Sequence, residues 1–496
     1  MFNKGEWIVP TVNGDLYTDK PILYFWLVLI ASKIVGAVNE WTVRLPPAFA
    51  GLGFVLATYF IGRDFFSPRI GFIAGAVVAT TVRVIWEARW AHTDMVFVFF
   101  FALSLYFAAR ALFREGHPSE MLLAYALMGL ATLTKGLIGV VVPALLLLTF
   151  VIVRRDWRLL LDARFPLGVP IFVLVAAPWF LLVNNTTGGK WFSDFIYVHH
   201  FQRYTAGAGH RQPFYYYFTT LPVDLMPWTI FAIAALFAYR PYRKLWDQPV
   251  SLFFTLWFVV VFVFFSISNT KRDLYLLPLF PPVALFIAKY FDDLINGSWS
   301  EGALYRILSL IFFHLVWVIA LALPVAAWFL RKDAIGIVLP SAMVMAAGGI
   351  LAVFCIQRRQ PWKLFQSTTL MMLLVVLSAS FLIMPYLEEY KSRRPFSREI
   401  NRKVPPGASL YIYADTMNDF NYYTEREVIP VVKSTGEFER LVLQGASGYI
   451  LIKDRDLQRL NTIPKDRIVA VDDVGGTTWN LISVAGQPSP RQAQSK

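Results

Sequence analysis

The sequence has little charge and almost no cysteine for a chain of its length. Only 16% of its 496 residues are charged and 57% are hydrophobic, whereas an ordinary globular domain carries about a quarter charged residues. The single cysteine, Cys355, lies in an apolar run, which excludes a disulfide framework and a thiolate metal site. The polar stretch from Met1 to Pro21 contains no apolar core of a cleavable signal peptide. No internal repeat at solenoid or propeller spacing is visible.

What the chain does have is repeated apolar runs of about 17 to 25 residues, the length that crosses a bilayer. Within such runs the backbone must be helical, because lipid offers no partner for a free N–H or C=O. We therefore predict a polytopic α-helical membrane protein with about 12 transmembrane helices in a domain spanning residues 43–386. The predicted spans are 43–62, 70–85, 94–113, 119–134, 137–153, 166–184, 217–238, 250–267, 276–291, 304–330, 335–356 and 366–386.

The net charge of +13 comes from lysines and arginines in short clusters between the apolar runs. This distribution indicates membrane topology rather than nucleic-acid binding. If the apolar stretch 22–38 is an interfacial helix, the basic clusters fall on every other connection, which the positive-inside rule assigns to the cytoplasm. Residues 1–42, the remaining connections and the chain from 387 onward would then face outward. The basic clusters begin at Arg63, Arg110, Arg154, Arg240, Lys289 and Arg358.

The C-terminal part of the chain changes character. SLYIYA, EVIPVV, GYILIK and NLISV are typical of short strands, and GEFERLVLQ and DRDLQRL are helical or turn segments between them. Strands that alternate with helices predict a small soluble α/β domain over residues 387–485. The polar end, residues 486–496, is predicted to be disordered.

Two polar groups occur near the predicted outward ends of the first spans. In NGDLYTDKP, Lys20 can bind a phosphate as a point charge, and Asp19 can bind a metal or a hydroxyl. The alternative is that both are ordinary charges at a helix start. In WEARWAHTDM, Asp94 stands at the start of a span, where it could contact a substrate amine or hydroxyl or simply cap the helix.

Three further groups lie on later connections. Lys135 occupies a tight hairpin, where it either snorkels or serves a site. Half of the six histidines fall between His199 and His210, a clustering that favours a metal or phosphate site. The proline-rich run LYLLPLFPP follows two cations, Lys271 and Arg272. Two adjacent cations beside a proline-broken helix are suited to binding a phosphate or diphosphate. Cations and carboxylates beside a hydrophobic body suit a lipid-linked anionic substrate.

These segments resemble the bacterial branch of the dolichyl-phosphate-mannose-protein mannosyltransferase superfamily, close to the lipid A 4-amino-4-deoxy-L-arabinose transferases. The resemblance covers nearly the whole chain. It rests on six motifs in order: GEWIVPTVNGDLYTDKP, VNEWTVRLPPAFAG, ARWAHTDM, TKG, HHFQRY followed by QPFYYYF and PW, and KRDLYLLPLFPP.

The resemblance implies an inverting GT-C glycosyltransferase of the bacterial inner membrane. It would move a sugar by direct displacement from a polyprenyl phosphate to lipid A or another glycolipid on the periplasmic face. Alternatives are a polyprenyl-linked lipid flippase or transporter, an envelope polymerase or ligase, and a protein O-mannosyltransferase. A transporter should carry polar residues at mid-span, whereas here most ionisable residues lie at span ends.

The resemblance also assigns roles to residues. The donor phosphate would be bound by Lys20, Arg203, Lys271, Arg272 and Tyr275. Supporting or substrate contacts would come from Tyr17, Arg89 and Lys135, and Asp94 is the candidate catalytic acid within the chain. One divalent metal, zinc, magnesium or manganese, would be held by Asp19 and His200. His199 stands where relatives carry an acid, a departure that bears on the metal.

The start of the chain also departs from the family pattern. Relatives carry an outward Asp-Glu motif, the expected catalytic base, after a first transmembrane helix and shortly before the segment that matches GEWIVP. This sequence begins at MFNKGEW. Our hypothesis is that Met1 corresponds to an internal methionine of a longer protein, so that residues 1–42 are a truncated first loop. Genomic sequence upstream of Met1 would test it.

Overall fold

The computed structural model describes residues 1–114, 117, 119–159, 163–197, 211–238, 248–297, 303–415, 419–443, 448–460 and 467–484. The chain divides into two compact units. The larger unit contains residues 1–10, 17–332 and 339–376, and the smaller contains 11–16, 333–338 and the chain from 377 onward. Residues 11–16 and 333–338 thus belong with the C-terminal part, although nothing in their sequence predicts it.

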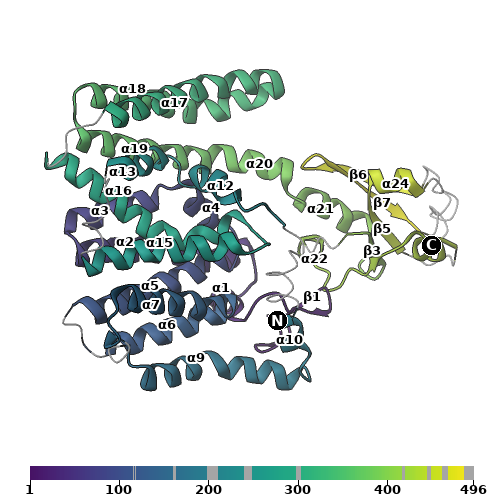
Figure 1. Cartoon of the computed structure of the whole chain (residues 1–496). Helices are drawn as coiled ribbons and strands as arrows, with labels where there is room; N and C mark the ends of the chain where they lie inside the picture. The colour runs from purple at the N-terminus through teal and green to yellow at the C-terminus, as the bar shows by residue number, and fades with distance from the viewer. Residues whose placement is uncertain are drawn as a thin grey trace. The chain divides into compact units, whose positions relative to one another are not determined.

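The larger unit is a body of helices (Figure 1). In chain order these are α1 (Leu23–Val35), α2 (Glu40–Phe65), α3 (Pro68–Ala79), α4 (Val82–Arg89), α5 (Asp94–Phe113), α6 (Ser119–Lys135), α7 (Ile138–Arg154), α9 (Phe165–Thr186), α10 (Lys190–Ser193), α12 (Tyr216–Asp224), α13 (Thr229–Ala238), α15 (Pro249–Ile267), η2 (Asp273–Leu279), α16 (Phe280–Ile295), α17 (Ala303–Leu330), α18 (Ile335–Gln357) and α19 (Pro361–Ser378). The first residues of α18 belong to the smaller unit.

The polytopic helical architecture is confirmed, but the count of twelve spans is not. Among the described residues, eight helices are long and apolar enough to cross a membrane, or up to ten if each of two bent helix pairs is one span. Every predicted apolar run contains a helix or a bent pair. The difference lies in the two bent pairs and in α6 and α7, which have 17 residues each. Helix α1, at 13 residues, is about 20 Å long and shorter than a bilayer core.

The two bent pairs replace the predicted straight spans 70–85 and 217–238. Helices α3 and α4 meet at 61°, and α12 and α13 meet at 113°. The first bend follows two threonines whose hydroxyls turn back onto the helix: Thr80 and Thr81 each donate to the carbonyl of the residue four positions earlier.

The two bends pack against each other. The Val82 amide donates to the Met226 carbonyl at 3.0 Å, and the Trp228 indole donates to the Thr80 hydroxyl at 3.0 Å. Polar backbone at membrane depth needs such partners, because lipid supplies none. Each break therefore satisfies the backbone of the other.

Close helix packing holds the centre of the body. Helix α2 packs against α3 and α5, and α5 packs against α6, which lies beside α7 and α9 (Figure 1). At the α2–α3 contact a Cβ on Gly62 would come within 2.6 Å of the Gly71 Cα, and one on Gly71 within 2.5 Å of the Tyr59 carbonyl oxygen. Small residues thus let the two backbones approach, as is usual between membrane helices.

The smaller unit is built on a mixed five-stranded sheet in the order β4-β3-β5-β7-β6. Strand β3 (Ser409–Tyr413) is parallel to β4 (Val431–Val432) and β5 (Gly448–Lys453), and β7 (Thr477–Ser483) is antiparallel to β5 and β6 (Ile468–Val474). The predicted strands in SLYIYA, GYILIK and NLISV are present, EVIPVV forms only a two-residue strand, and β6 was not predicted.

Both faces of this sheet are covered, so its central strand alternates between two cores. Leu451 of β5 faces a cluster with Phe396 and Ile400 of α21 (Arg394–Lys403), and its neighbours Ile450 and Ile452 face a second cluster. The second cluster packs under α23 (Thr435–Leu443) and α24 (Asp454–Leu460). The remaining helical elements are η3 (Lys332–Ala334), η4 (Ala379–Ile383), α20 (Met384–Lys391) and α22 (Asp419–Tyr423). This is the α/β arrangement that the sequence predicts.

An N-terminal hairpin belongs to the same unit. Strands β1 (Thr11–Val12) and β2 (Asp15–Leu16) flank Asn13, whose backbone is left-handed with φ 51°. The Asn13 side chain donates to the Ile429 carbonyl at 2.9 Å and accepts from the Ile429 amide at 2.7 Å and from Asn421 at 2.9 Å. The hairpin is therefore fixed by its turn residue, only a few residues before Asp19 and Lys20.

Candidate functional site

The first polar group forms where two antiparallel helices meet end to start. Helix α5 begins at Asp94, and α6 ends at Lys135. The two side chains form an ion pair with Lys135 Nζ 2.5 Å from Asp94 Oδ1, and both are about nine-tenths buried. Each charge also complements the dipole of its own helix terminus. Helix α5 has no side-chain cap hydrogen bond, so Asp94 binds Lys135 rather than capping its helix.

Aromatic rings enclose the Lys135 ammonium. It lies 4.7 Å from the ring centre of Tyr275 and 5.1 Å from that of Phe97. Such cation–π contacts strengthen when the cation is removed from water. Lys135 therefore does not snorkel to the surface, as one of the two sequence-based alternatives supposed, but is held in a partly aromatic cage beside a carboxylate.

The N-terminal segment brings a second cation to this group. Lys20 lies close enough to Asp94, as does His92, to act on its carboxylate electrostatically. Lys20 Nζ is also 3.3 Å from Asp19 Oδ2, and the Tyr17 hydroxyl is 3.5 Å from the same oxygen. The carbonyl of Tyr17 accepts from the buried Trp191 indole at 2.9 Å, which anchors the segment. The structure thus gathers six predicted residues: Tyr17, Asp19, Lys20, Asp94, Lys135 and Tyr275.

Lys271 has a different environment from that of the other predicted phosphate ligands. It is buried, and its ammonium donates to the Ser268 carbonyl at 2.5 Å and to the Gln212 carbonyl at 3.3 Å. These two bonds join the loop before η2 to the segment at Gln212. Burial lowers the pKa of Lys271. An ammonium has three donors, so one N–H of Lys271 is left by these contacts.

Arg272, the next residue, is half-buried, and its carbonyl accepts from the Tyr217 hydroxyl at 3.2 Å and from the Tyr275 amide at 3.0 Å. The backbone of Arg272 therefore fixes the start of η2, the element that carries Tyr275 to Lys135.

A second polar cluster, which the sequence analysis missed, surrounds Arg83. Its guanidinium donates to Asp224 at 2.9 and 2.7 Å, to Glu87 at 3.3 Å and to Asp273. The side chains of Glu87 and Asp224 are more than nine-tenths buried. Arg83 lies in α4, just after the first helix break, and Asp224 ends α12, just before the second. Asp273 begins η2. The Arg83 cluster thus ties both broken helices to the element that carries Tyr275.

His92 lies between the two clusters. Its Nδ1 is 3.8 Å from Glu87 Oε2, and the ring lies close enough to Asp94 to interact with its carboxylate. The signal that could have revealed the Arg83 cluster is present in the sequence: Arg83 and Asp224 are ionisable residues inside runs read as apolar spans. Ionisable residues within membrane spans are rare, and they usually pair with one another or serve a function.

Other predicted site residues lie outside these two groups. Arg89 is exposed at the end of α4. Arg203 and His200 lie outside the described residues, as does most of the histidine-rich segment. Within the ranges that the structure describes, no group of three or more histidine, cysteine, aspartate or glutamate side chains could hold a metal ion. Metal binding by Asp19 and His200 therefore remains a prediction, and we derive no step through a metal.

The opposite end of the helical body carries a charged group of another kind. Asp64, at the end of α2, pairs with Arg63 at 2.8 Å, Arg114 at 3.5 Å and Arg110 at 3.7 Å. It also accepts from the Tyr106 hydroxyl at 2.7 Å. The connections that begin at Arg63 and Arg110, which the positive-inside rule assigned to one side, do share one end of the body.

The comparisons with known proteins agree with this architecture. Residues 19–181 match the family described as dolichyl-phosphate-mannose-protein mannosyltransferase. A crystal structure of ArnT from Cupriavidus metallidurans bound to undecaprenyl phosphate superposes with a TM-score of 0.77 at 21% identity, over 98% of this chain and 92% of that one. The fold is therefore that of a GT-C membrane glycosyltransferase.

Two curated relatives indicate which transferases this chain resembles. The undecaprenyl phosphate-alpha-4-amino-4-deoxy-L-arabinose arabinosyl transferase of Pectobacterium atrosepticum is 28% identical over 73% of this chain and 66% of its own length, just under two thirds. The protein of the same name from Shewanella sediminis is 26% identical over 88% of this chain and 80% of its own length. The chain is therefore similar to the dolichyl-phosphate-mannose-protein mannosyltransferase family over residues 19–181, and to these arabinosyl transferases over most of its length.

Proposed function

We propose that this protein transfers a sugar from a polyprenyl-phosphate donor to an envelope glycolipid. The favoured donor is undecaprenyl phosphate-linked 4-amino-4-deoxy-L-arabinose, which the names of the relatives specify, and the favoured acceptor is lipid A. The observation that carries the proposal is the gathering of Lys20, Asp94, Lys135 and Tyr275 at one end of a helical membrane body. On the topology predicted from the basic connections, this end faces the periplasm from the inner membrane.

Donor binding falls to the cations of the site. A polyprenyl phosphate places its anionic head at the interface and its tail in the bilayer. Lys20 is partly exposed, with 24% of its side chain accessible, so it can reach such a head group while Asp19 orients it. Lys135 and Lys271 lie deeper and hold the surrounding segments. Charge that builds on the leaving phosphate during displacement would be stabilised electrostatically by these preorganised groups.

Asp94 is better suited to orientation than to proton transfer. One of its oxygens is bound to Lys135, and two further basic side chains, Lys20 and His92, act on its charge. The carboxylate thereby fixes Lys135 and attracts Lys20 toward the place where the donor phosphate would lie. If the acceptor is a phosphate, as on lipid A, it needs little help from a base.

The distribution of charge weighs against a transporter. In the described spans, ionisable side chains lie near helix ends or at the two breaks, apart from His314 in the middle of α17, whose ring bonds to the Leu310 carbonyl. An alternating-access carrier would place its polar residues at the bilayer midplane. A protein O-mannosyltransferase or an envelope ligase would use the same donor chemistry, and only the acceptor separates these from the favoured function.

The donor half of the proposal is tested with purified protein and a synthetic short-chain polyprenyl-phosphate aminoarabinose. Lys20→Ala should lower the transfer rate at least about a hundredfold, the size typical for loss of one preorganised electrostatic contact. Lys4→Ala is the matched control, because Lys4 is an exposed lysine of the same N-terminal segment. Unimpaired turnover by Lys20→Ala would refute its role with the donor phosphate.

The acceptor is tested in cells. Mass spectrometry of lipid A from a strain lacking this protein should show loss of the aminoarabinose modification. Unchanged lipid A would remove lipid A as the acceptor while leaving the donor chemistry open to another glycolipid or to a protein hydroxyl.

A further inference from the structure

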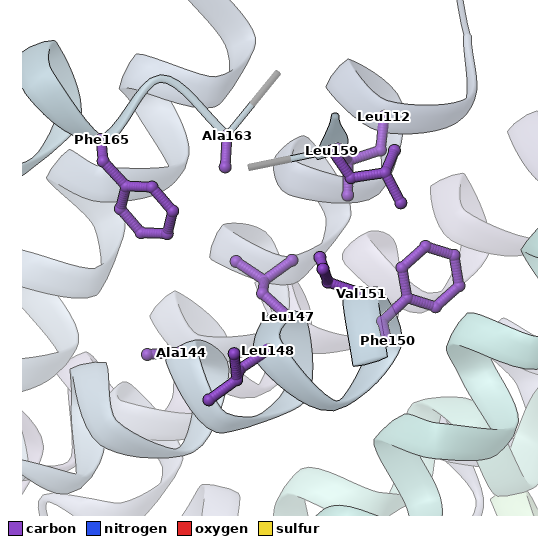
Figure 2. Close-up of a pocket in the computed structure, with 9 residues that line it drawn as sticks. All are labelled: Leu112, Ala144, Leu147, Leu148, Phe150, Val151, Leu159, Ala163 and Phe165. Carbon is purple, nitrogen blue, oxygen red and sulfur yellow. The ribbon is translucent and has the colours of Figure 1, made fainter. Parts of the chain in front are cut away.

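An apolar pocket lies on the helical body, far from the Asp94 site. It is lined by five residues of α7, with one from the end of α5, two from the connection after α7 and one from the start of α9. Figure 2 shows these nine side chains around a common space: Leu112, Ala144, Leu147, Leu148, Phe150, Val151, Leu159, Ala163 and Phe165. None carries a polar side-chain atom, so the pocket suits a hydrocarbon chain.

The pocket and the Asp94 site lie at opposite ends of α5. Eighteen residue positions separate Asp94 from Leu112, which is about 27 Å along a helix axis. This is close to the thickness of a bilayer core. The pocket is therefore distinct from the site proposed to bind the sugar donor.

Four arginines border the pocket. Arg154 follows Leu147 and Val151 by seven and three positions on α7, which puts it on the face that lines the pocket. Arg155 ends that helix, Arg158 precedes Leu159, and Arg164 separates Ala163 from Phe165. Arg154, Arg155 and Arg158 are exposed, and so is Trp157, at 60%.

These arginines differ from the arginines around Asp64 and from Arg69. Arg63, Arg110 and Arg114 all pair with carboxylates, and Arg69 pairs with Asp292. No ion pair links the guanidinium of Arg154, Arg155, Arg158 or Arg164 to a carboxylate in the described ranges. Asp156, two positions before Arg158, accepts from the Arg158 backbone amide. Within the described part of this connection, Arg154, Arg155 and Arg158 therefore offer their positive charge to an external anion.

We propose that Arg154, Arg155 and Arg158, together with the pocket, form a binding site for an anionic phospholipid of the bilayer. The phosphodiester head group lies among Arg154, Arg155 and Arg158, and part of one acyl chain inserts into the pocket between α7 and α9. Basic pockets between membrane helices bind anionic head groups in this way. The exposed Trp157 sits at the level of the head groups, where tryptophan is enriched.

The test uses the full-length protein purified in detergent, with lipid binding counted by native mass spectrometry. Phosphatidylglycerol, phosphatidylcholine of the same acyl chains and glycerophosphoglycerol, the head group without tails, are titrated separately. Phosphatidylglycerol should bind more tightly than either of the other two by on the order of tenfold or more. Equal binding of the two lipids would overturn the requirement for charge. Equal binding of the head group alone would overturn the role of the pocket.

Two variants separate the two parts of the site. R154Q/R155Q/R158Q should lower phosphatidylglycerol affinity at least about tenfold, whereas R358Q/R359Q/K363Q should not. The control removes three exposed basic residues from the α18–α19 connection, which contributes no residue to the pocket. Ala144→Trp, which fills the pocket, should weaken binding with all arginines present, and Val141→Trp, one turn away on α7, should not.

Unfolding midpoints measured without added lipid verify that each variant is folded. Equal losses in the arginine variant and its control would refute a specific site. The readout does not depend on sugar transfer, so failure of the lipid site and failure of the proposed enzymatic function are distinguishable.

Discussion

Each end of the helical body buries a carboxylate beside cations, but the number of cations that contact the carboxylate differs between the two ends. At one end Asp64 contacts three arginines and a tyrosine hydroxyl, and the arginines remain partly exposed. At the other end, among the residues that the structure describes, Asp94 has one direct cationic partner, Lys135, which is itself nine-tenths buried and lies beside two aromatic rings. The Asp64 group can lose a member and keep its charge balance, whereas the Asp94 pair cannot.

This difference suggests what each end is for. A redundant, solvated cluster stabilises the helix ends and fixes topology. A single buried pair is costly to form and gives little net stability compared with an apolar packing of the same shape. The position of this pair beside Lys20 and Tyr275 therefore favours a role in function rather than in stability. The variants below test this contrast between the Asp64 group and the Asp94–Lys135 pair.

The largest effect is expected from breaking the Asp94–Lys135 pair. Lys135→Met leaves a buried carboxylate without its partner and should cost about 3 to 5 kcal/mol of stability. The double variant Asp94→Asn/Lys135→Met removes both charges and should recover most of that loss. Sugar transfer should remain abolished in both. The unfolding midpoint and transfer rate of the two proteins check this, and an active double variant would make the pair purely structural.

A somewhat smaller effect is expected at the Arg83 cluster. Arg83→Gln leaves Glu87 and Asp224 buried without a cation and should cost about 3 kcal/mol. Because Asp273 begins η2, affinity for the polyprenyl phosphate should fall as well. Arg83→Lys should restore little, since one ammonium cannot reproduce the fork that contacts three carboxylates.

Arg44→Gln serves as the control for the Arg83 variants, because Arg44 is an exposed arginine of α2. Thermal unfolding and binding isotherms measure both effects. A rescue by lysine would contradict the geometric role of the guanidinium.

The pH dependence of donor binding tests Lys271. A lysine whose pKa is lowered by burial loses its proton, and so its attraction for a phosphate, at less alkaline pH than usual. Donor affinity should thus begin to fall at a lower pH than it would for a lysine with the ordinary pKa of about 10.4. Lys271→Arg keeps its charge over this range and should move the alkaline limb to higher pH. Identical pH profiles for the two proteins would exclude Lys271 from donor binding.

The smallest effect is expected at the opposite end. Arg114→Gln should change stability by less than about 1 kcal/mol, because Arg63 and Arg110 still contact Asp64 and exposed ion pairs contribute little. The transfer rate should equal that of the unmodified protein. A loss comparable with that of Lys135→Met would show that the two ends do not differ in redundancy after all.

Much of the fold could be predicted because it rests on local composition. Apolar runs of bilayer length must be helical, so α5 was placed at residues 94–113 and α15 to within a residue of its observed start. The alternating strands of the small domain were found for the same reason, except β6, whose VAVDDV sequence carries two aspartates that weaken the strand pattern. The motifs also indicated the family whose model matches residues 19–181, since the order of motifs is a property of the chain itself.

Only the tertiary structure decided which charges meet. Asp94 and Lys135 are 41 positions apart, and Arg83 and Asp224 are 141 apart. Their contacts depend on the packing of α5 against α6 and on two helix breaks that satisfy each other's backbone. The fixing of the Asn13 hairpin by Asn421 and Ile429 likewise has no sequence signal. The periodicity of the sequence predicts which face of each segment is buried. Long-range packing determines which charged groups become neighbours, and that packing placed Lys135 beside Asp94.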